Sequence, residues 1–397
     1  MVLIRFNFGL TRDFWILMLS LLLINMFGLG FSPFLPYFLR EIGASISEVA
    51  FVLAFSRIAY TLLLSVGGLA GDLVGRKAPM ILGPVIVGAS YIVLAGARSW
   101  SDAILPLTFS LLPGAFIAPA VFAYIGDVVE PLKYGRAFGI YYSIMNISAI
   151  LGYLIVGSLV DRFGYSFSIL AVGVVAILGA FTRVWLRETR RAVKEIAVLV
   201  YLREAYGYLR QRVVLLLVIL LSLYMGLASV LDSVIFPLWA REIVSLKEVD
   251  FSIILSLEAA IYSMLSPIGG RLAESRTLWI YLSALELLIK IPALLLLSHA
   301  TSFLQLLAVL LLNSGLAIFV IPGLNSRLSA ALSSAHRGAI WGMQQSFISA
   351  ATICFTLIGG YAWESLGNVI TVHIFLFYPV VMVLLLVVLA GLERRGG

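Results

Sequence analysis

Twelve apolar runs follow one another along the chain, and each is long enough to cross a hydrocarbon layer of about 30 Å as a helix. They cover residues 14–38, 47–70, 79–97, 103–126, 136–160 and 165–186, then 213–239, 251–273, 277–298, 303–326, 338–363 and 369–391. Six runs, a break and six more runs predict an all-α polytopic membrane protein with twelve transmembrane helices in two six-helix bundles.

The break between the sixth and seventh runs, Arg187 to Arg212, is the most polar stretch of the chain. Its apolar positions Ile196, Leu199 and Val200 keep helical spacing among charges, which predicts an amphipathic linker helix at the membrane surface. The predicted domains are an N-terminal bundle over residues 1–186, a cytoplasmic linker over 187–212 and a C-terminal bundle over 213–397.

The two halves of the chain repeat one another at offsets of 201 to 203 residues. The sequence Pro-x-x-x-Arg-Glu-Ile begins at Pro36 and returns at Pro237. The other matched pairs are Gly68 with Gly270, Asp72 with Glu274, Pro119 with Pro322, Gly139 with Gly342, Gly157 with Gly360, and Gly164 with Gly367. A membrane chain built from two related halves predicts a secondary transporter whose binding site lies between them.

Composition and charge support a membrane protein. Of 397 residues, 62% are hydrophobic and 12% charged, which is more apolar surface than a soluble protein of this length can bury. With both termini in the cytoplasm, twenty Lys and Arg residues fall on inner loops, five on outer loops and two inside spans, a distribution that predicts this orientation. The net charge of +7 therefore reflects membrane topology, and no nucleic-acid partner is expected.

No metal site or cofactor is expected from the scarce ligand residues. The chain has one cysteine, Cys354, and its histidines, His299, His336 and His373, are far apart in sequence. A thiol site or a disulfide framework needs more cysteines than this.

The sequence between the second and third runs carries a specific motif. Residues 67–77 read GGLAGDLVGRK. They resemble the signature G-x-x-x-D-x-x-G-R-[K/R] of the major facilitator superfamily at every fixed position, namely Gly68, Asp72, Gly75, Arg76 and Lys77. Together with the twelve runs and the repeat, the resemblance covers essentially the whole chain. It implies two pseudo-symmetric bundles around a central cavity that opens alternately to either side.

The motif also has a physical interpretation as a latch. Asp72 would be stabilised near the N-terminus of a neighbouring helix, which the resemblance identifies as the helix that begins near Gly338. The contact would hold the cytoplasmic ends of the two halves together. Asp127 and Arg136, which flank the next inner loop, are predicted to join this latch; ordinary interfacial charges are the alternative.

The fifth run is similar to the helix-5 motif G-x8-G-x3-G-P-x2-G-G of drug/proton antiporters within the superfamily. Here the positions are Gly139, Ser148, Gly152, Tyr153 and Gly157. Small residues keep the spacing and predict close helix packing, whereas Tyr153 replaces the motif's proline. The sequence therefore leaves drug export open as one alternative.

Five ionisable residues lie inside predicted spans: Arg57, Asp232, Glu258, Glu286 and Lys290. A charge at bilayer depth is costly and is usually kept for function. Arg57 and Glu258 are 201 positions apart, so we expect them at pseudo-equivalent sites where they could pair across the cavity. Glu258 or Asp232 could carry a proton, because a low-dielectric setting favours the neutral acid and a nearby cation favours the ionised form.

Two alternatives keep these charges within the C-terminal half. Glu258 and Lys290 fall at similar predicted depths on consecutive helices, so Lys290 rather than Arg57 could be the partner of Glu258. Glu286 and Lys290 are spaced i,i+4, which predicts a structural ion pair on one helix.

Uncharged polar residues add candidates for substrate contact, because amides and phenols give directional hydrogen bonds in a dry cavity. They are Asn25, Tyr124, Asn146, Asn313, Gln344 and Gln345. Hydrogen bonds between helices are the alternative role for each.

The sequence as a whole predicts a monomeric, proton-coupled secondary transporter of a small organic solute in the cytoplasmic membrane, with no cofactor. Export and metabolite uptake are both open. An intramembrane enzyme is not expected, because the chain has no H-E-x-x-H motif and no nucleophile–base pair. A transport-fold sensor is the alternative from another class.

Overall fold

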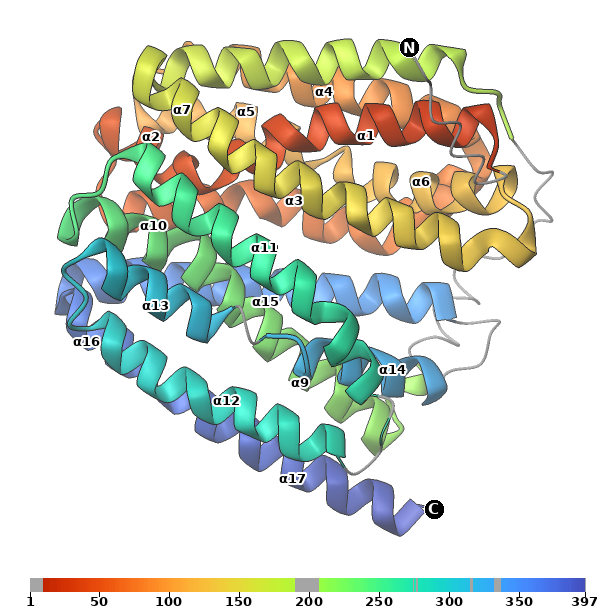
Figure 1. The fold of residues 1–397 in the computed structure, drawn as a ribbon. Helices are drawn as coiled ribbons and strands as arrows, with labels where there is room; N and C mark the ends of the chain where they lie inside the picture. Colours follow the sequence, from red (N-terminus) through yellow and green to blue (C-terminus); the bar gives the residue numbers. More distant parts are fainter. Residues whose placement is uncertain are drawn as a thin grey trace, which may run out of the picture.

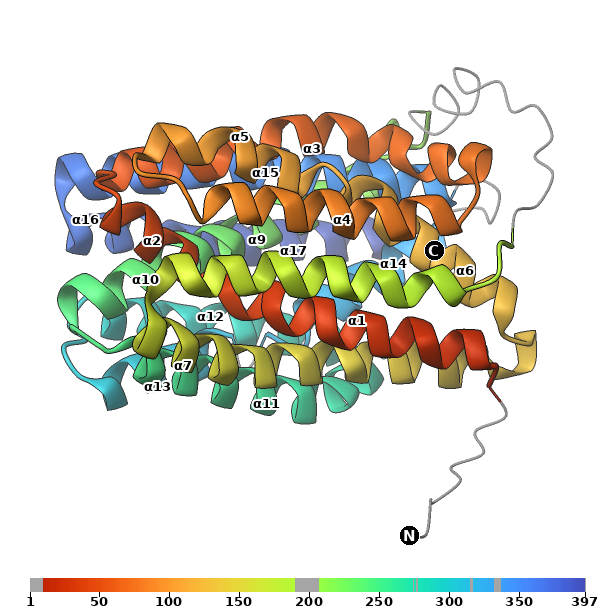
Figure 2. The same cartoon turned by 90° about the horizontal axis from the view of Figure 1, so that it is seen from above.

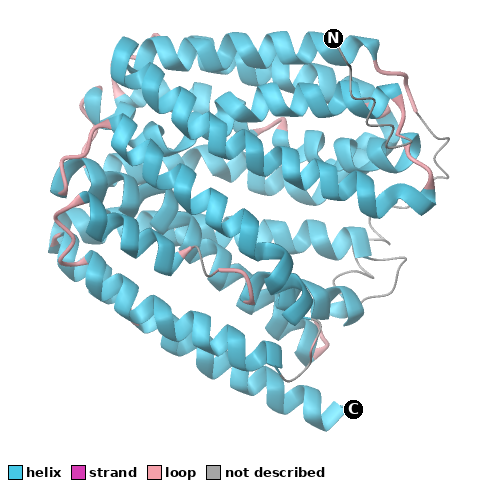
Figure 3. Ribbon diagram, in the orientation of Figure 1, coloured by secondary structure: helices cyan, strands magenta, loops and turns pink. Residues whose placement is uncertain are grey.

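The computed structural model describes residues 10–189, 207–273, 275, 278–314, 317–331 and 337–396, with the backbone alone for residues 65–74, 131, 135, 273, 330, 337–340 and 393–396. Every element in these ranges is a helix (Figure 3). This is the result expected where lipid offers backbone groups no hydrogen bonds, because a helix satisfies them within one segment.

The first half of the chain is built from α1 (Arg12–Phe31), η1 (Ser32–Phe34), α2 (Leu35–Glu41), α3 (Ile46–Val74), α4 (Lys77–Leu94), α5 (Trp100–Leu111), α6 (Gly114–Val128), η2 (Pro131–Lys133), α7 (Tyr134–Thr182) and η3 (Arg183–Trp185). The second half comprises α9 (Arg212–Val230), η4 (Leu231–Ile235), α10 (Phe236–Leu238), η5 (Trp239–Ile243), α11 (Glu248–Ala273), α12 (Leu278–Leu297), α13 (Phe303–Asn313), α14 (Val320–Ala331), α15 (Arg337–Leu366), α16 (Asn368–Ile374) and α17 (Phe377–Gly396).

The predicted count of twelve membrane crossings is confirmed. Ten described helices are long and apolar enough to cross a membrane. One of them, α7, contains both the fifth and the sixth predicted runs, joined at Gly164 with φ 81°. The tenth predicted run is divided into α13 and α14, so ten long helices, one additional crossing in α7 and one divided helix make twelve.

The two halves meet along two seams (Figures 1 and 2). At one seam α3 packs against α15, and at the other α7 packs against α11. Repeated glycines lie at both: Gly157 on α7 faces Ser252, and Gly360 on α15 faces Ala50, with no room for a side chain at either position. The repeat thus supplies a small residue at one close approach in each of the two seams.

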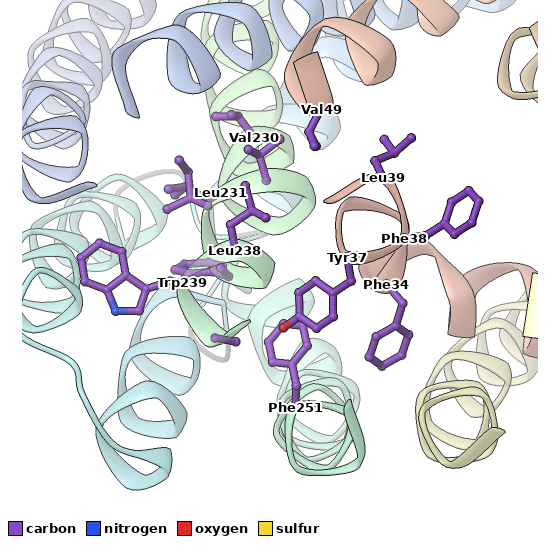
Figure 4. Packing of buried hydrophobic residues seen from close by; sticks show 14 of the residues in the cluster. Phe34, Tyr37, Phe38, Leu39, Val49, Val230, Leu231, Leu238, Trp239 and Phe251 are labelled. Carbon is purple, nitrogen blue, oxygen red and sulfur yellow. The ribbon is translucent and has the colours of Figure 1, made fainter. Parts of the chain in front are cut away.

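We call the end of the molecule that carries α2, α10 and α16 the distal end, because α1 begins and α17 ends at the opposite side (Figure 1). Aromatic side chains from both halves pack there (Figure 4). Tyr37 stacks on Phe251 with ring centroids 5.9 Å apart, and Phe34 meets the same ring edge-on. These apolar contacts seal the two halves together at the distal end.

Polar contacts reinforce this distal seal. The Arg40 Nε lies 2.6 Å from Glu242 Oε1. Arg241 donates to the Tyr165 hydroxyl at 2.6 Å, and the backbone N–H of Ser47 donates to Glu364 at 2.7 Å. Each of these bonds joins one half of the chain to the other.

The domain boundaries remain a prediction. The linker helix predicted within residues 187–212 falls largely on residues 190–206, which lie outside the described part of the chain. Its first residues dock on the N-terminal half, where Arg187 lies 3.9 Å from Asp13 and the Thr189 hydroxyl donates to Asp127 at 2.9 Å.

Candidate functional site

The tenth membrane-crossing helix is broken near its middle. Its first segment, α13, ends at Asn313, and its second segment, α14, begins at Val320. A break of this kind leaves carbonyl groups at the end of one segment and N–H groups at the start of the next without helical partners. The adjacent α12 packs against both segments and supplies side chains to both ends.

Lys290 and Glu286, both on α12, satisfy the two broken ends. Lys290 Nζ donates to the Asn313 carbonyl oxygen at 2.5 Å, while a Glu286 carboxylate oxygen accepts from the N–H groups of Phe319 and Val320 at 3.0 and 3.1 Å. The cation therefore faces a helix C-terminus and the anion a helix N-terminus, the arrangement that helix dipoles favour.

Tyr224 on α9 connects these two charges. Its hydroxyl donates a short hydrogen bond to Glu286, and its ring lies 5.3 Å from Lys290 Nζ in a cation–π contact. The predicted structural ion pair of Glu286 and Lys290 stays a prediction: the two charges interact electrostatically, but the salt bridges of the described residues do not include one between them. The free backbone groups of the broken helix take both side chains instead.

Two more carboxylates interact with the same ammonium group, although the ion pairs of the described residues include neither of them with Lys290. Asp232 lies on η4, a π-helical turn, and π-helical turns often mark functional positions. Asp232 and Glu258 interact electrostatically with each other and with Lys290. The Asp232 side chain is exposed, whereas Lys290 is only 6% exposed.

A cavity lies beside Lys290 within the C-terminal half. It is small, with room for about one water molecule, and its lining includes Tyr224, Lys290, Asn313 and Tyr378. The Tyr378 hydroxyl and Asn313 Oδ1 are buried and have no hydrogen-bond partner among the described residues. Buried polar atoms are rarely left unsatisfied, so this cavity is suited to a polar guest.

Tyr153 brings the N-terminal half to the site. This residue occupies the position of the proline in the antiporter motif, and it interacts electrostatically with both Glu258 and Asp232. Nearby on the same helices, the Ser256 hydroxyl donates to the Ile150 carbonyl at 3.0 Å, which fixes α11 against α7. Sequence reasoning noted Tyr153 as a departure from the motif but did not place it at the carboxylates.

The expected pairing of Arg57 with Glu258 is absent from this conformation. Arg57 is half-buried on α3 and interacts electrostatically with Tyr60, whereas Glu258 interacts with Asp232 and Lys290. The reason is geometric: α3 packs against α15, where Thr61 and Ser349 share a hydrogen bond of 2.6 Å, and α11 packs against α7. Positions related by the repeat therefore lie at different seams.

The six uncharged polar candidates divide by environment. Asn313 lines the cavity. Asn25 donates to the Leu21 carbonyl of its own helix at 2.8 Å, and Tyr124 is buried in an apolar cluster. Gln344 is buried, Asn146 half-buried and Gln345 exposed. The structure brings Asn313 to the charged centre, and a substrate role for the others stays a prediction.

The motif at residues 67–77 is described only in part. Gly75 adopts φ 99°, a conformation that favours glycine, and Arg76 lies 3.8 Å from Asp127. The side chain of Asp72, the Gly68 position and the helix start near Gly338 fall outside the described side chains, so the latch stays a prediction. Lys77 donates to the Val184 carbonyl at 2.6 Å, and Arg136 is exposed at the start of α7.

Glu188 is a partner of this motif that sequence reasoning missed. Its carboxylate accepts from the backbone N–H groups of Arg76 and Lys77 at 3.0 and 3.3 Å, so it satisfies donors at the start of α4. No local pattern indicates this contact, because Glu188 and Lys77 are 111 positions apart in the chain.

Comparison with known proteins agrees with this architecture. The family model described as Major Facilitator Superfamily matches residues 17–353. Multidrug resistance protein 2 of Bacillus subtilis (strain 168) is 24% identical over 185 residues, which cover 46% of this chain and 46% of that protein. Quinolone resistance protein NorA of Staphylococcus aureus (strain MRSA252) is 24% identical over 144 residues, 36% of this chain and 37% of that protein. The chain spans less than half the length of either relative.

A solved structure extends the likeness over the full fold. The crystal structure of a POT family transporter in complex with 5-aminolevulinic acid has a TM-score of 0.79 and covers 98% of this chain and 97% of its own. Sequence identity is 12%, so the likeness concerns the fold alone.

Proposed function

Because the chain belongs to the Major Facilitator Superfamily of membrane transporters, we propose that it exports small organic solutes in exchange for protons across the cytoplasmic membrane. One observation supports the proposal: Asp232 and Glu258 both interact electrostatically with the ammonium group of Lys290, which binds the carbonyl end of a broken helix. Discontinuous helices at the middle of a transporter commonly hold substrate and coupling ions.

Charge counting explains why this centre suits a proton. Asp232 and Glu258 carry two negative charges when ionised and Lys290 carries one positive charge, while Glu286 is engaged by the backbone of α14. One proton on either carboxylate therefore makes the trio neutral. Both carboxylates lie on membrane-crossing segments, where a net charge is costly, so proton binding and release would change the electrostatic energy of the centre.

The distal seal supplies one of the two states that alternating access requires. Arg40, Glu242 and the stacked Tyr37 and Phe251 close the distal end. The excess of Lys and Arg on the predicted inner loops assigns this end to the outside of the cell. The conformation then corresponds to a transporter that is closed outside, and export follows when protonation of the centre accompanies opening of the seal.

Export is preferred to uptake because relatives in the family are named for drug resistance, as in Multidrug resistance protein 2 and Quinolone resistance protein NorA. One observation favours the second candidate, a proton-coupled uptake system. Tyr153 stands where drug/proton antiporters have a helix-5 proline, and it lies near both carboxylates.

Transport by the full chain in proteoliposomes tests the proposal. Fluorescent amphipathic dyes such as ethidium serve as probes, with and without an imposed pH gradient of either direction. We expect gradient-driven dye movement in the wild type, and its loss in Asp232→Asn and Glu258→Gln while dye-for-dye exchange persists. Glu130→Gln is the control, because Glu130 is 70% exposed and pairs locally with Lys133.

Two results would sink the proposal. If both carboxylate variants kept full gradient-driven transport, neither residue would carry the coupling proton. A proton exchanger accumulates dye in the vesicles when the lumen is the more acidic side, whereas a symporter does so when the outside is more acidic. If dye accumulated only with the outside acidic, the chain would be an uptake symporter.

A further inference from the structure

The ammonium group of Lys290 lies where other transporters with broken helices coordinate a free cation, at the carbonyl end of the first helix segment. We propose that the C-terminal end of α13 is a monovalent-cation site that the chain fills with its own Lys290 side chain. Without that side chain, the site would take a free cation of the alkylammonium or alkali-metal class. This inference does not depend on export, because cation binding is measured without transport.

Lys290 Nζ contacts one oxygen directly and lies beside a cavity that carries two further oxygens. The Asn313 carbonyl oxygen is 2.5 Å away. Two further oxygens belong to residues that line the same cavity, Asn313 Oδ1 and the Tyr378 hydroxyl, and neither has a hydrogen-bond partner among the described residues. Hard monovalent cations prefer carbonyl, amide and hydroxyl oxygens of this kind.

The electrostatic field at this position is negative from several directions. The carbonyl end of α13 contributes the negative pole of a helix dipole. Asp232, Glu258 and Glu286 all interact electrostatically with the ammonium group, and the face of the Tyr224 ring lies 5.3 Å away. A buried position with this field is unfavourable when it is left without a positive charge.

The N-terminal half lacks both the full break and the charges. The fourth crossing is divided between α5 and α6 at the equivalent positions, but Leu112 and Pro113 keep helical backbone angles there. At the offset of 203 residues, Gly83 and Val87 of α4 replace Glu286 and Lys290. Gly83 packs directly against Ile117 and Pro113, so apolar contacts cover that junction. The charged arrangement is therefore specific to the C-terminal half.

Thermal unfolding of the purified full chain in detergent tests the site. The variants are Lys290→Ala, which opens space for a free cation, and Lys290→Met, which fills that space without a charge. Each is melted in choline chloride, sodium chloride and propylammonium chloride at equal ionic strength. Propylammonium matches the atoms that Lys290→Ala removes beyond Cβ.

We expect the melting temperature of the wild type to be the same in all three salts. Lys290→Ala should melt several degrees lower in choline and recover in a saturable manner with propylammonium or sodium, because a ligand that binds the folded state stabilises it. Lys290→Met should also melt lower but show no recovery. Equal recovery in both variants, or none in Lys290→Ala, would overturn the proposal.

A second neutral variant keeps the test decisive if Lys290→Ala yields no folded protein. Lys290→Gln can still donate an N–H to the Asn313 carbonyl but brings no charge. We expect it to melt several degrees below the wild type in every salt. A melting temperature equal to that of the wild type would show that the site needs a hydrogen-bond donor and not a cation, and would refute the inference.

Discussion

Arg40 and Glu242 form an ion pair of 2.6 Å across 202 positions of the chain. Each residue belongs to one of the two copies of the repeated Pro-x-x-x-Arg-Glu-Ile sequence, and the copies meet at the distal end. The two copies of the repeated sequence are therefore similar to one another and also in contact with one another. The arginine of the first copy binds the glutamate of the second.

Loss of this ion pair should loosen the distal seal. Arg40 and Glu242 are 33% and 25% exposed, so we expect Arg40→Gln or Glu242→Gln to weaken the seal by only about 0.5–1 kcal/mol, a roughly two- to fivefold rise in the open population. The readout is the maleimide labelling rate of Ala44→Cys, a buried distal position, in a Cys354→Ser background.

The double variant provides the control for this first prediction. If the two residues act through their contact, the combined effect will be smaller than the sum of the single effects. Additive effects, or slower labelling in either single variant, would contradict it.

The paired glycines at the two seams should not tolerate side chains. In Gly157→Val the new atoms would overlap Ser252, and in Gly360→Val they would overlap Ala50. We expect each variant to lose about 1–3 kcal/mol of unfolding free energy, as overpacked interfaces do. Denaturant unfolding in mixed micelles measures this. Gly139→Val is the matched control on α7, because a Cβ there meets no atom within 4 Å. If this variant lost as much unfolding free energy as the other two, the cause would be the poorer helix propensity of valine and not overlap at the seams.

Glu286 should contribute to stability through the backbone of α14. We expect Glu286→Gln to lower the free energy of unfolding by about 1–3 kcal/mol, because a neutral amide accepts more weakly from the N–H groups of Phe319 and Val320. Thermal unfolding gives the magnitude. Tyr224→Phe, which removes only the hydroxyl donor to Glu286, should cost less; a larger loss in that variant would place the main interaction at Tyr224.

Glu188 should protect the start of α4 from exchange with solvent. Glu188→Ala removes the acceptor for the Arg76 and Lys77 N–H groups, so we expect faster amide hydrogen exchange at these two positions. The free energy of local opening there should fall by at most about 1 kcal/mol. Mass spectrometry of peptides across residues 70–80 measures it. Glu130→Ala is the control and should leave exchange at Arg76 and Lys77 at the wild-type rate. If Glu188→Ala also exchanged at the wild-type rate, the contact would not protect these amides.

Much of the fold was predictable from local sequence. Apolar runs long enough to cross a bilayer located the helices, because a lipid environment leaves a single-chain segment few alternatives to a helix. The repeat predicted two related halves and matched Gly157 with Gly360, the two glycines that the structure places at the seams. The motif at residues 67–77 indicated the family.

The partners of the buried charges could not be predicted in the same way. The spacing of Glu286 and Lys290 suggested that they bind each other, and the offset between Arg57 and Glu258 suggested a contact across the cavity. Both inferences assumed continuous helices facing one another. The break between α13 and α14 offers backbone groups that bind Glu286 and Lys290 more directly, and the two seams separate α3 from α11.

The sequence alone therefore determined which segments cross the membrane, that the halves are related, and which residues carry charge at bilayer depth. The tertiary structure decided where the tenth crossing breaks and which groups Lys290, Glu258 and Tyr153 approach. The physical reason is that hydropathy is a property of a segment, whereas a buried charge is stabilised by whatever dipoles and ions the packing of distant helices brings within a few ångströms.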